Sequence, residues 1–141
     1  METIEAAQDE IVEEFSIFED WIQRYEYMIE LGKSLPLIDP QFKIDDFIIK
    51  GCQSKVWVHA DLVDDKLIFT ADSDAIITKG IIAILIRVFS NQHPDAILEA
   101  NTEFIDKIGL KEHLSPTRAN GLVSMIKQLK MYAIAFKTQL N

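Results

Sequence analysis

The sequence contains a single cysteine, Cys52, among its 141 residues. One cysteine excludes an intramolecular disulfide, and it excludes zinc and iron–sulfur sites that need four thiolates. From Cys52 the successive spacings to the three histidines, His59, His93 and His113, are 7, 34 and 20 residues, which match no metal-ligand pattern. The five glycines are dispersed, so no phosphate-binding glycine loop is present. We therefore expect neither a metal nor a resident cofactor.

Basic residues are also few. Lys and Arg number 14 against 23 acids, giving a net charge of −9. A nucleic-acid binder needs a basic face, so this balance argues against one. Residues 1–20 hold eight acids and no base, the opposite of a signal peptide's basic start. The acid-free residues 113–141 carry four bases, and we interpret this asymmetry either as solvated helix faces or as a surface that steers a charged partner.

Long hydrophobic runs are missing as well. The most apolar stretch, 76–89, is interrupted by Lys79 and Arg87 and falls short of the ~20 residues that cross a bilayer. We expect no membrane association and a cytoplasmic location. The length suits one domain spanning residues 1–141, which is large enough to bury a hydrophobic core without disulfides or metal ions.

Helical periodicity predicts two helices at the start of the chain. One apolar stripe comes first, at Ile4, Ala7, Ile11, Phe15 and Phe18. Asp20 is then a candidate cap for a second helix that ends near Gly32, with a buried face at Trp21, Ile22, Tyr25, Met28 and Ile29.

The later helices have equally clear starts. Asp72 or Ser73 is expected to cap the very apolar helix 76–89, Pro94 to open a short helix, and Thr102 to cap another. Ser115 and Pro116 begin a long final helix.

The middle of the chain changes to a strand-like pattern. Short segments rich in β-branched and aromatic residues predict three antiparallel strands at 46–51, 55–61 and 66–72. Asp64-Asp65 suits a hairpin turn between the last two. Helices, then strands, then helices indicate an α+β fold.

Cys52 is the most informative residue for chemistry. It lies in Lys50-Gly51-Cys52-Gln53-Ser54-Lys55, a polar, glycine-containing loop. The two lysines are expected to favour the thiolate, which predicts a reactive thiol on a loop. The alternative is a buried, inert cysteine. His59 is near in sequence, but no hydrolase signature surrounds it.

The motif Gly51-Cys52-Gln53-Ser54-Lys55-Val56-Trp57 resembles that of the SufE family of sulfur acceptors. Further blocks agree in order and spacing over about residues 20–130. They are Trp21, Arg24-Tyr25, Ile29-Glu30-Leu31-Gly32-Lys33, Leu35-Pro36, Asp72-Ser73-Asp74-Ala75, Lys79-Gly80, Leu114-Ser115-Pro116-Thr117-Arg118, Gly121-Leu122 and Met125.

The resemblance implies a sulfur carrier. SufE-like proteins take persulfide sulfur from a pyridoxal-phosphate (PLP)-dependent cysteine desulfurase and pass it towards an iron–sulfur scaffold complex, so Cys52 is the implied persulfide-carrying thiol. Gly51, Gln53, Ser54 and Arg118 are the implied supporting residues. The implied fold is a SufE/IscU-like small antiparallel sheet with flanking helices. The scaffold's three-cysteine cluster site is not implied, because this chain has one cysteine.

Several alternatives stay open at this point. The chain is either a sulfur acceptor or a non-catalytic module that regulates a desulfurase, and its partner belongs either to the Suf-type system or to a paralogous one. Arg118 either serves the sulfur site or forms an ordinary salt bridge with Asp72 or Asp74. Cys52 is expected to be shielded in the free protein, with the apolar helix around 81–89 behind it, and to become accessible on partner binding.

Overall fold

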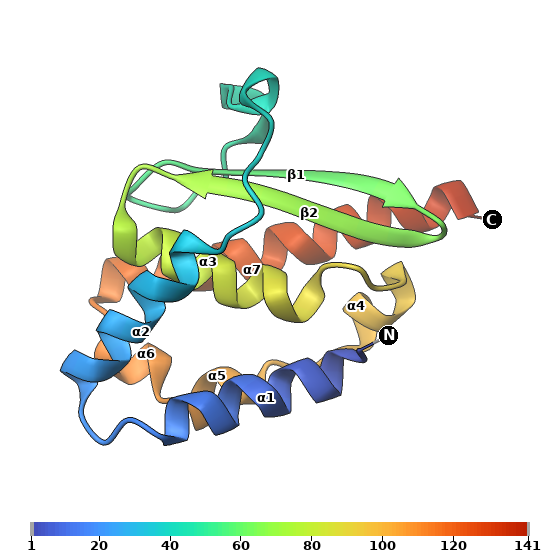
Figure 1. The fold of residues 1–141 in the computed structure, drawn as a ribbon. Coiled ribbons are helices and arrows are strands. Elements are labelled where there is room, and N and C mark those ends of the chain that lie inside the picture. The colour runs from blue at the N-terminus through green and yellow to red at the C-terminus, as the bar shows by residue number, and fades with distance from the viewer. Residues whose placement is uncertain (1, 141) are drawn as a thin grey trace.

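The computed structural model describes residues 2–140 and has an α+β architecture (Figure 1). The helices are α1 (Ile4–Ser16), α2 (Trp21–Lys33), α3 (Ile76–Phe89), α4 (Pro94–Glu99), α5 (Glu103–Lys107), α6 (Leu110–His113) and α7 (Pro116–Lys137), with 3-10 turns η1 (Pro40–Phe42), η2 (Asp45–Phe47) and η3 (Thr138–Leu140). The strands are β1 (Val56–Val63) and β2 (Lys66–Ser73).

The two strands form one antiparallel hairpin, in register from Val56 opposite Ser73 to Val63 opposite Lys66. The predicted turn is confirmed. Asp64 and Asp65 have φ values of 51° and 66°, a left-handed conformation that aspartate tolerates better than most residues. Alternate residues of β1 are buried, among them Val56 and Val58.

The prediction of a strand at 46–51 is wrong. Asp45–Phe47 curls into η2, and Gly51 turns the chain with a φ of 96°. Only Ile48 and Ile49 are left extended between these turns. Ile48 forms an isolated bridge with Trp57, and the Ile49 N–H donates to the Val56 carbonyl at 2.8 Å. The sheet in residues 2–140 therefore has two strands.

Helix α3 is the centre of the molecule, and it runs along the face of the hairpin (Figure 1). Its residues from Ile81 to Ile86 are all buried. Helix α2 crosses it closely because two glycines meet. A Cβ added at Gly80 would overlap the Met28 carbonyl oxygen, and one added at Gly32 would lie 3.1 Å from the Gly80 nitrogen.

Some helix starts are as predicted and others are not. Asp20 accepts from the Gln23 N–H at 2.8 Å, and Pro94 opens α4. Neither Asp72 nor Ser73 is the N-cap of α3, because β2 continues to Ser73 and the cap position falls on Ala75.

Three smaller predictions also need correction. Thr102 occupies the N-cap of α5, but its side chain makes no capping bond, and Asn101 accepts from the Glu103 N–H instead. Ile22, expected on the buried face of α2, is 72% exposed. Phe18 lies beyond the end of α1.

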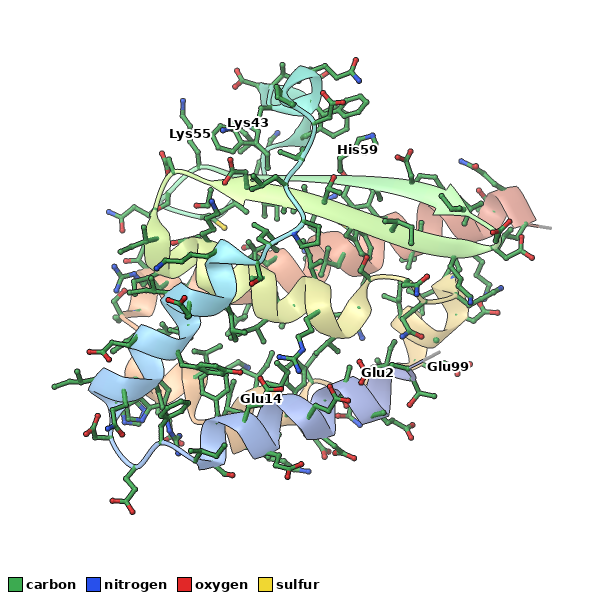
Figure 2. The ribbon with its side chains drawn as sticks, viewed as in Figure 1. Glu2, Glu14, Lys43, Lys55, His59 and Glu99 are labelled. Carbon is green, nitrogen blue, oxygen red and sulfur yellow. The ribbon has the colours of Figure 1, made fainter. Side chains whose placement is uncertain are left out.

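The segment before the Cys52 loop stands on the face of the hairpin away from α3, and we call residues 39–48 the tab (Figure 1). Aromatic stacking holds the tab to β1, with the Phe42 ring 3.9 Å from the His59 ring between centroids. Lys43 adds an ion pair with Asp72 at 3.0 Å and lies over the Trp57 ring; Figure 2 labels Lys43 and His59. The tab therefore anchors the chain just upstream of Cys52.

Candidate functional site

Cys52 lies in the turn that leads into β1, and it packs against α7. Its Sγ lies 3.6 Å from the Gly121 carbonyl oxygen, to which the thiol donates. The side chain is half-buried. The prediction of a loop cysteine is confirmed, and the partial cover comes from a helix nearly seventy residues further along the chain.

Two glycines make this close packing possible. Gly51 has a φ of 96°, where a side chain is strained, and a Cβ there would overlap the Ser124 hydroxyl on α7. Gly121 faces the thiol, and a Cβ there would lie 3.3 Å from Sγ of Cys52. Side chains at either position would separate the turn from α7.

The thiol opens onto a pocket of about 70 Å³. Its lining brings Cys52 together with three of its four predicted supporting residues, Gln53, Ser54 and Arg118. Gly51 does not line the pocket and acts through the backbone turn. The other lining residues come from two helices: Thr78 and Ile81 from α3, and Gly121 and Met125 from α7.

From the sequence, α3 was expected behind the thiol and Arg118 was expected near it, but Gly121 and Met125 of α7 were not assigned to the site. A signal was present, because Gly121 and Met125 belong to the family-like blocks. A glycine in the apolar stretch of a helix also indicates a close approach by another segment. Thr78 had no such signal, since a buried threonine on a helix is common.

The electrostatics of the thiol differ from expectation. Burial raises the pKa of Cys52, because the pocket disfavours the charged form. The expected lowering by Lys50 and Lys55 is wrong. Both lysines are exposed, and the Lys55 side chain is labelled in Figure 2 on the outside of the molecule. The free protein therefore holds Cys52 mainly as a neutral thiol at pH 7.

Arg118 lies in the first turn of α7, after Ser115, whose hydroxyl accepts from the Arg118 N–H at 3.3 Å. The alternative salt bridge with Asp72 or Asp74 is wrong within residues 2–140. Asp72 pairs with Lys43 and Lys79, and Asp74 accepts from the Lys55 N–H. The guanidinium is exposed at the mouth of the Cys52 pocket.

The histidines are engaged elsewhere. His59 stacks on Phe42, His113 stacks on Trp21, and His93 accepts the Asp95 N–H at the start of α4. None of them lines the Cys52 pocket. In the part of the chain that the structure describes, no three His, Cys, Asp or Glu side chains lie together as metal ligands. Nor is any described helix long and apolar enough to cross a membrane.

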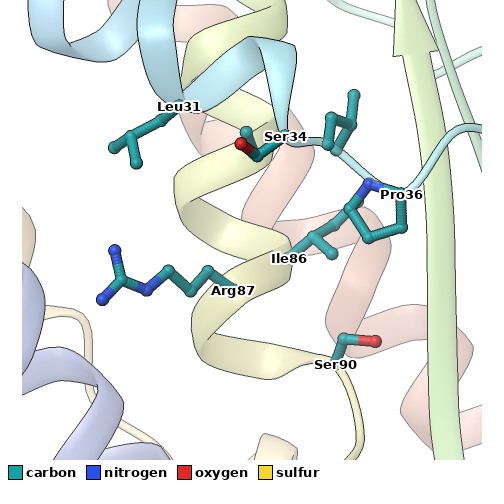
Figure 3. A pocket seen from close by; sticks show the side chains of 8 residues that line it. Leu31, Ser34, Pro36, Ile86, Arg87 and Ser90 are labelled. Carbon is teal, nitrogen blue, oxygen red and sulfur yellow. The ribbon is translucent and has the colours of Figure 1, made fainter.

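A second pocket, of about 290 Å³, lies between the end of α2 and α3 (Figure 3). Its lining is largely apolar, including Leu31, Pro36 and Ile86. The guanidinium of Arg87 is the charged group there, and it already pairs with Glu14 and Glu10 of α1. This pocket contains no thiol, no base lies beside its two serines, and its one cation is neutralised, so we do not assign the reactive site to it.

Comparison with known proteins identifies the group to which the chain belongs. The family model described as "SufE: Fe-S metabolism associated domain" matches residues 9–133. The chain belongs to the SufE family. The motif around Cys52 thus indicated the correct family, and its association is with iron–sulfur metabolism.

Relatives come from distant organisms. This SufE-family chain is 41% identical over 130 residues to an uncharacterized SufE-like protein of Rhizobium meliloti, covering 89% of this chain and 93% of the relative. It is 39% identical to one from Synechocystis, covering 90% and 80%. It is also 36% identical to "SufE-like protein 1, chloroplastic/mitochondrial" of Arabidopsis thaliana, covering 89% of this chain and 34% of that longer protein.

The fold has a solved counterpart. A hypothetical protein from Thermus thermophilus, whose solution structure is known, superimposes with a TM-score of 0.78 at 22% identity, covering 94% of this chain and 96% of that one. At this identity the likeness establishes the fold alone.

Proposed function

We propose that this protein accepts sulfur on Cys52 from the persulfide of a PLP-dependent cysteine desulfurase and passes it to iron–sulfur cluster assembly. The observation that carries the proposal is the position of Cys52. The only thiol in a SufE-family chain opens onto a small pocket that it shares with Gln53, Ser54 and Arg118.

The transfer step needs no cofactor in this chain. The Cys52 thiolate attacks the outer sulfur of the partner's persulfide, forming a new S–S bond as the partner's S–S bond breaks. The electron pair of the broken bond leaves with the partner's cysteine, now a thiolate, and the proton stays on the transferred sulfur. No net oxidation occurs, so one cysteine is sufficient. PLP chemistry belongs to the desulfurase.

The pocket supports this role in two ways. It offers a cavity of about 70 Å³ beside Sγ, on the scale of one added atom, with apolar cover from Ile81 and Met125. Arg118 places a positive charge at the mouth, where it favours an anionic persulfide. We infer that the bound sulfur is kept from bulk oxidants and thiols between transfers.

The raised pKa gives the resting protein low reactivity. Because attack requires the thiolate, we infer that the desulfurase moves the turn outward and exposes Cys52. Gly51 is the hinge, since its left-handed backbone accommodates large changes of φ at small cost. The cytoplasm is the expected location, and the Suf-type and paralogous desulfurases are both candidate donors.

Mass spectrometry after incubation with a purified desulfurase and ³⁵S-labelled cysteine tests the proposal. The wild-type chain should gain sulfur on Cys52, in a form that a reductant removes. Cys52→Ser should fold normally and gain none, and the exposed-surface change Ser16→Ala serves as the matched control. Sulfur transfer that persists in Cys52→Ser overturns the proposal. Stimulation of the desulfurase without labelling of Cys52 identifies a regulatory module instead.

Alkylation of Cys52 with iodoacetamide tests the shielding. The rate in the free protein should be far below that of the urea-unfolded chain, and it should rise when the desulfurase is added. A free-protein rate equal to the unfolded rate and unchanged by the partner contradicts the shielded state.

A further inference from the structure

Helix α7 carries two apolar stripes, and only one of them packs into the core. Leu122, Met125, Leu129 and Ala133 face the core and are buried. A second stripe at Val123, Met131 and Ile134 points outward, with exposed fractions of 52, 51 and 56%. Ile126 lies half-buried between the two stripes.

The outer stripe lines two adjoining hollows that share Lys127 and Met131. One, of about 460 Å³, lies between α7 and the segment that contains Thr102 and Lys111. The other, of about 370 Å³, continues to Asp46, Ile48 and Lys50 in front of the Cys52 turn. We call the two hollows together the α7 outer groove.

The groove is basic on a strongly acidic protein. Four lysines line it, Lys50, Lys111, Lys127 and Lys130, against one carboxylate among its described lining residues, Asp46. The chain as a whole carries −9. A local basic, apolar surface on such a background favours a partner that presents apolar side chains flanked by carboxylates.

The shape fits one helix. From Val123 to Ile134 the outer stripe runs about 16 Å, or three helical turns. An amphipathic helix laid along it would match its i, i+3, i+4 spacing, which is a common mode of protein recognition. We propose that the α7 outer groove binds an amphipathic, acidic helix of a partner protein, next to the Cys52 turn.

A second copy of the chain is a poor occupant. The acidic helix is α1, and its apolar residues Ile4, Ala7, Ile11 and Phe15 are already buried in its own core. An anionic membrane is also disfavoured as an occupant. The four lysines lie in a concave groove, and the net charge of −9 on the whole chain repels an anionic surface.

The groove makes no use of the Cys52 thiol, so this inference does not depend on the proposed sulfur chemistry. Its Ser124 edge contacts Gly51, so a helix seated there would lie against the turn. The groove shares no lining residue with the Cys52 pocket, so a helix seated in the groove does not occupy that pocket.

Fluorescence anisotropy with the full chain tests the proposal. The probe is a labelled model helix of about four turns with a leucine stripe flanked by glutamates. The matched probe has the same leucines flanked by lysines. We expect saturable binding of the acidic probe that weakens with added salt, and at least about tenfold weaker binding of the basic probe.

Variants locate the binding. Ile134→Asp and Lys127→Glu should each weaken the acidic probe by about tenfold, the loss typical of an important interface residue. Ile22→Asp and Lys33→Glu, at exposed positions of α2, should leave binding unchanged. An unchanged Cys52 alkylation rate confirms that the groove variants fold correctly.

Several outcomes overturn the proposal. They are no saturable binding of the acidic probe, equal affinity for the two probes, or binding insensitive to Ile134→Asp and Lys127→Glu. Self-association of the chain that only the groove variants abolish assigns the groove to a second copy. Binding of phosphatidylserine vesicles lost in the same variants assigns it to a membrane surface.

Discussion

The Cys52 thiol rests against the backbone of Gly121, with Sγ 3.6 Å from the carbonyl oxygen and no side chain between them. This contact joins the turn before β1 to the second turn of α7. It determines how much of the sulfur is covered, and it therefore connects the packing of a helix to the reactivity of a loop.

Gly121→Ala should loosen that contact. The added Cβ lies 3.3 Å from Sγ, so the turn must move by a few tenths of an ångström. We expect faster Cys52 alkylation at little cost in stability, because alanine is favoured over glycine inside a helix by about 1 kcal/mol. Asn120→Ala, an exposed change in the same turn of α7, should leave the rate unaltered. An unchanged rate in Gly121→Ala contradicts the covering role.

Gly51→Ala should destabilise the protein more. A residue with a side chain at a φ of 96° is strained by about 1–3 kcal/mol, and here its Cβ also overlaps the Ser124 hydroxyl. Urea unfolding measures the loss. Adding Ser124→Ala should recover the part due to the overlap and leave the backbone strain. Full recovery in the double variant would show that the φ value imposes no cost.

The pH dependence of alkylation follows from burial. The raised pKa of Cys52 means that the folded state prefers the neutral thiol. The thiolate fraction, and with it the alkylation rate, should therefore rise at a higher pH than in the urea-unfolded chain, where a free cysteine has a pKa of about 8.5. A midpoint at or below the unfolded value contradicts this environment.

Arg118→Ala separates function from stability. The guanidinium makes no ion pair within residues 2–140, and a cation in the first turn of a helix opposes the dipole. We expect unchanged or slightly raised stability. Sulfur acceptance from the desulfurase should fall by about tenfold, as when one hydrogen bond to a charged group is removed. Arg118→Lys should retain part of the activity, and a loss of stability with normal transfer would assign Arg118 a structural role.

The acidic helix α1 is joined to α3 through Glu14, which pairs with Arg87 and accepts from Tyr27; Glu14 is labelled in Figure 2. The hydrogen bonds from Arg87 lower the pKa of Glu14. Its contribution is therefore present above its unfolded pKa of about 4.3 and is lost as the pH falls through the lower folded value.

Glu14→Gln should accordingly lower the melting temperature at pH 7, and the difference from wild type should shrink as the solution is acidified below about pH 4. Glu13→Gln, at an exposed position of the same helix, is the control. A difference that stays constant from neutral to acid pH contradicts the ion pair.

Features that depend on neighbouring residues could be predicted from the sequence. The structure confirms such local properties: the apolar spacing of α1, the helix starts at Asp20 and Ser115, and the Asp64-Asp65 turn. The motif around Cys52 likewise placed the thiol on a loop and indicated the family. Such features depend on side chains within a few residues of one another, so the distant parts of the chain change them little.

Features that depend on residues distant in sequence could not be predicted in this way. A strand at 46–51 was plausible from composition, but it had to compete with the stacking of Phe42 on His59, which holds the tab in turns. The charge state of Cys52 depends on burial beneath α7, which outweighs two exposed lysines nearby in sequence. Residues distant in sequence meet only when the core assembles, so neither outcome was readable from the residues around them.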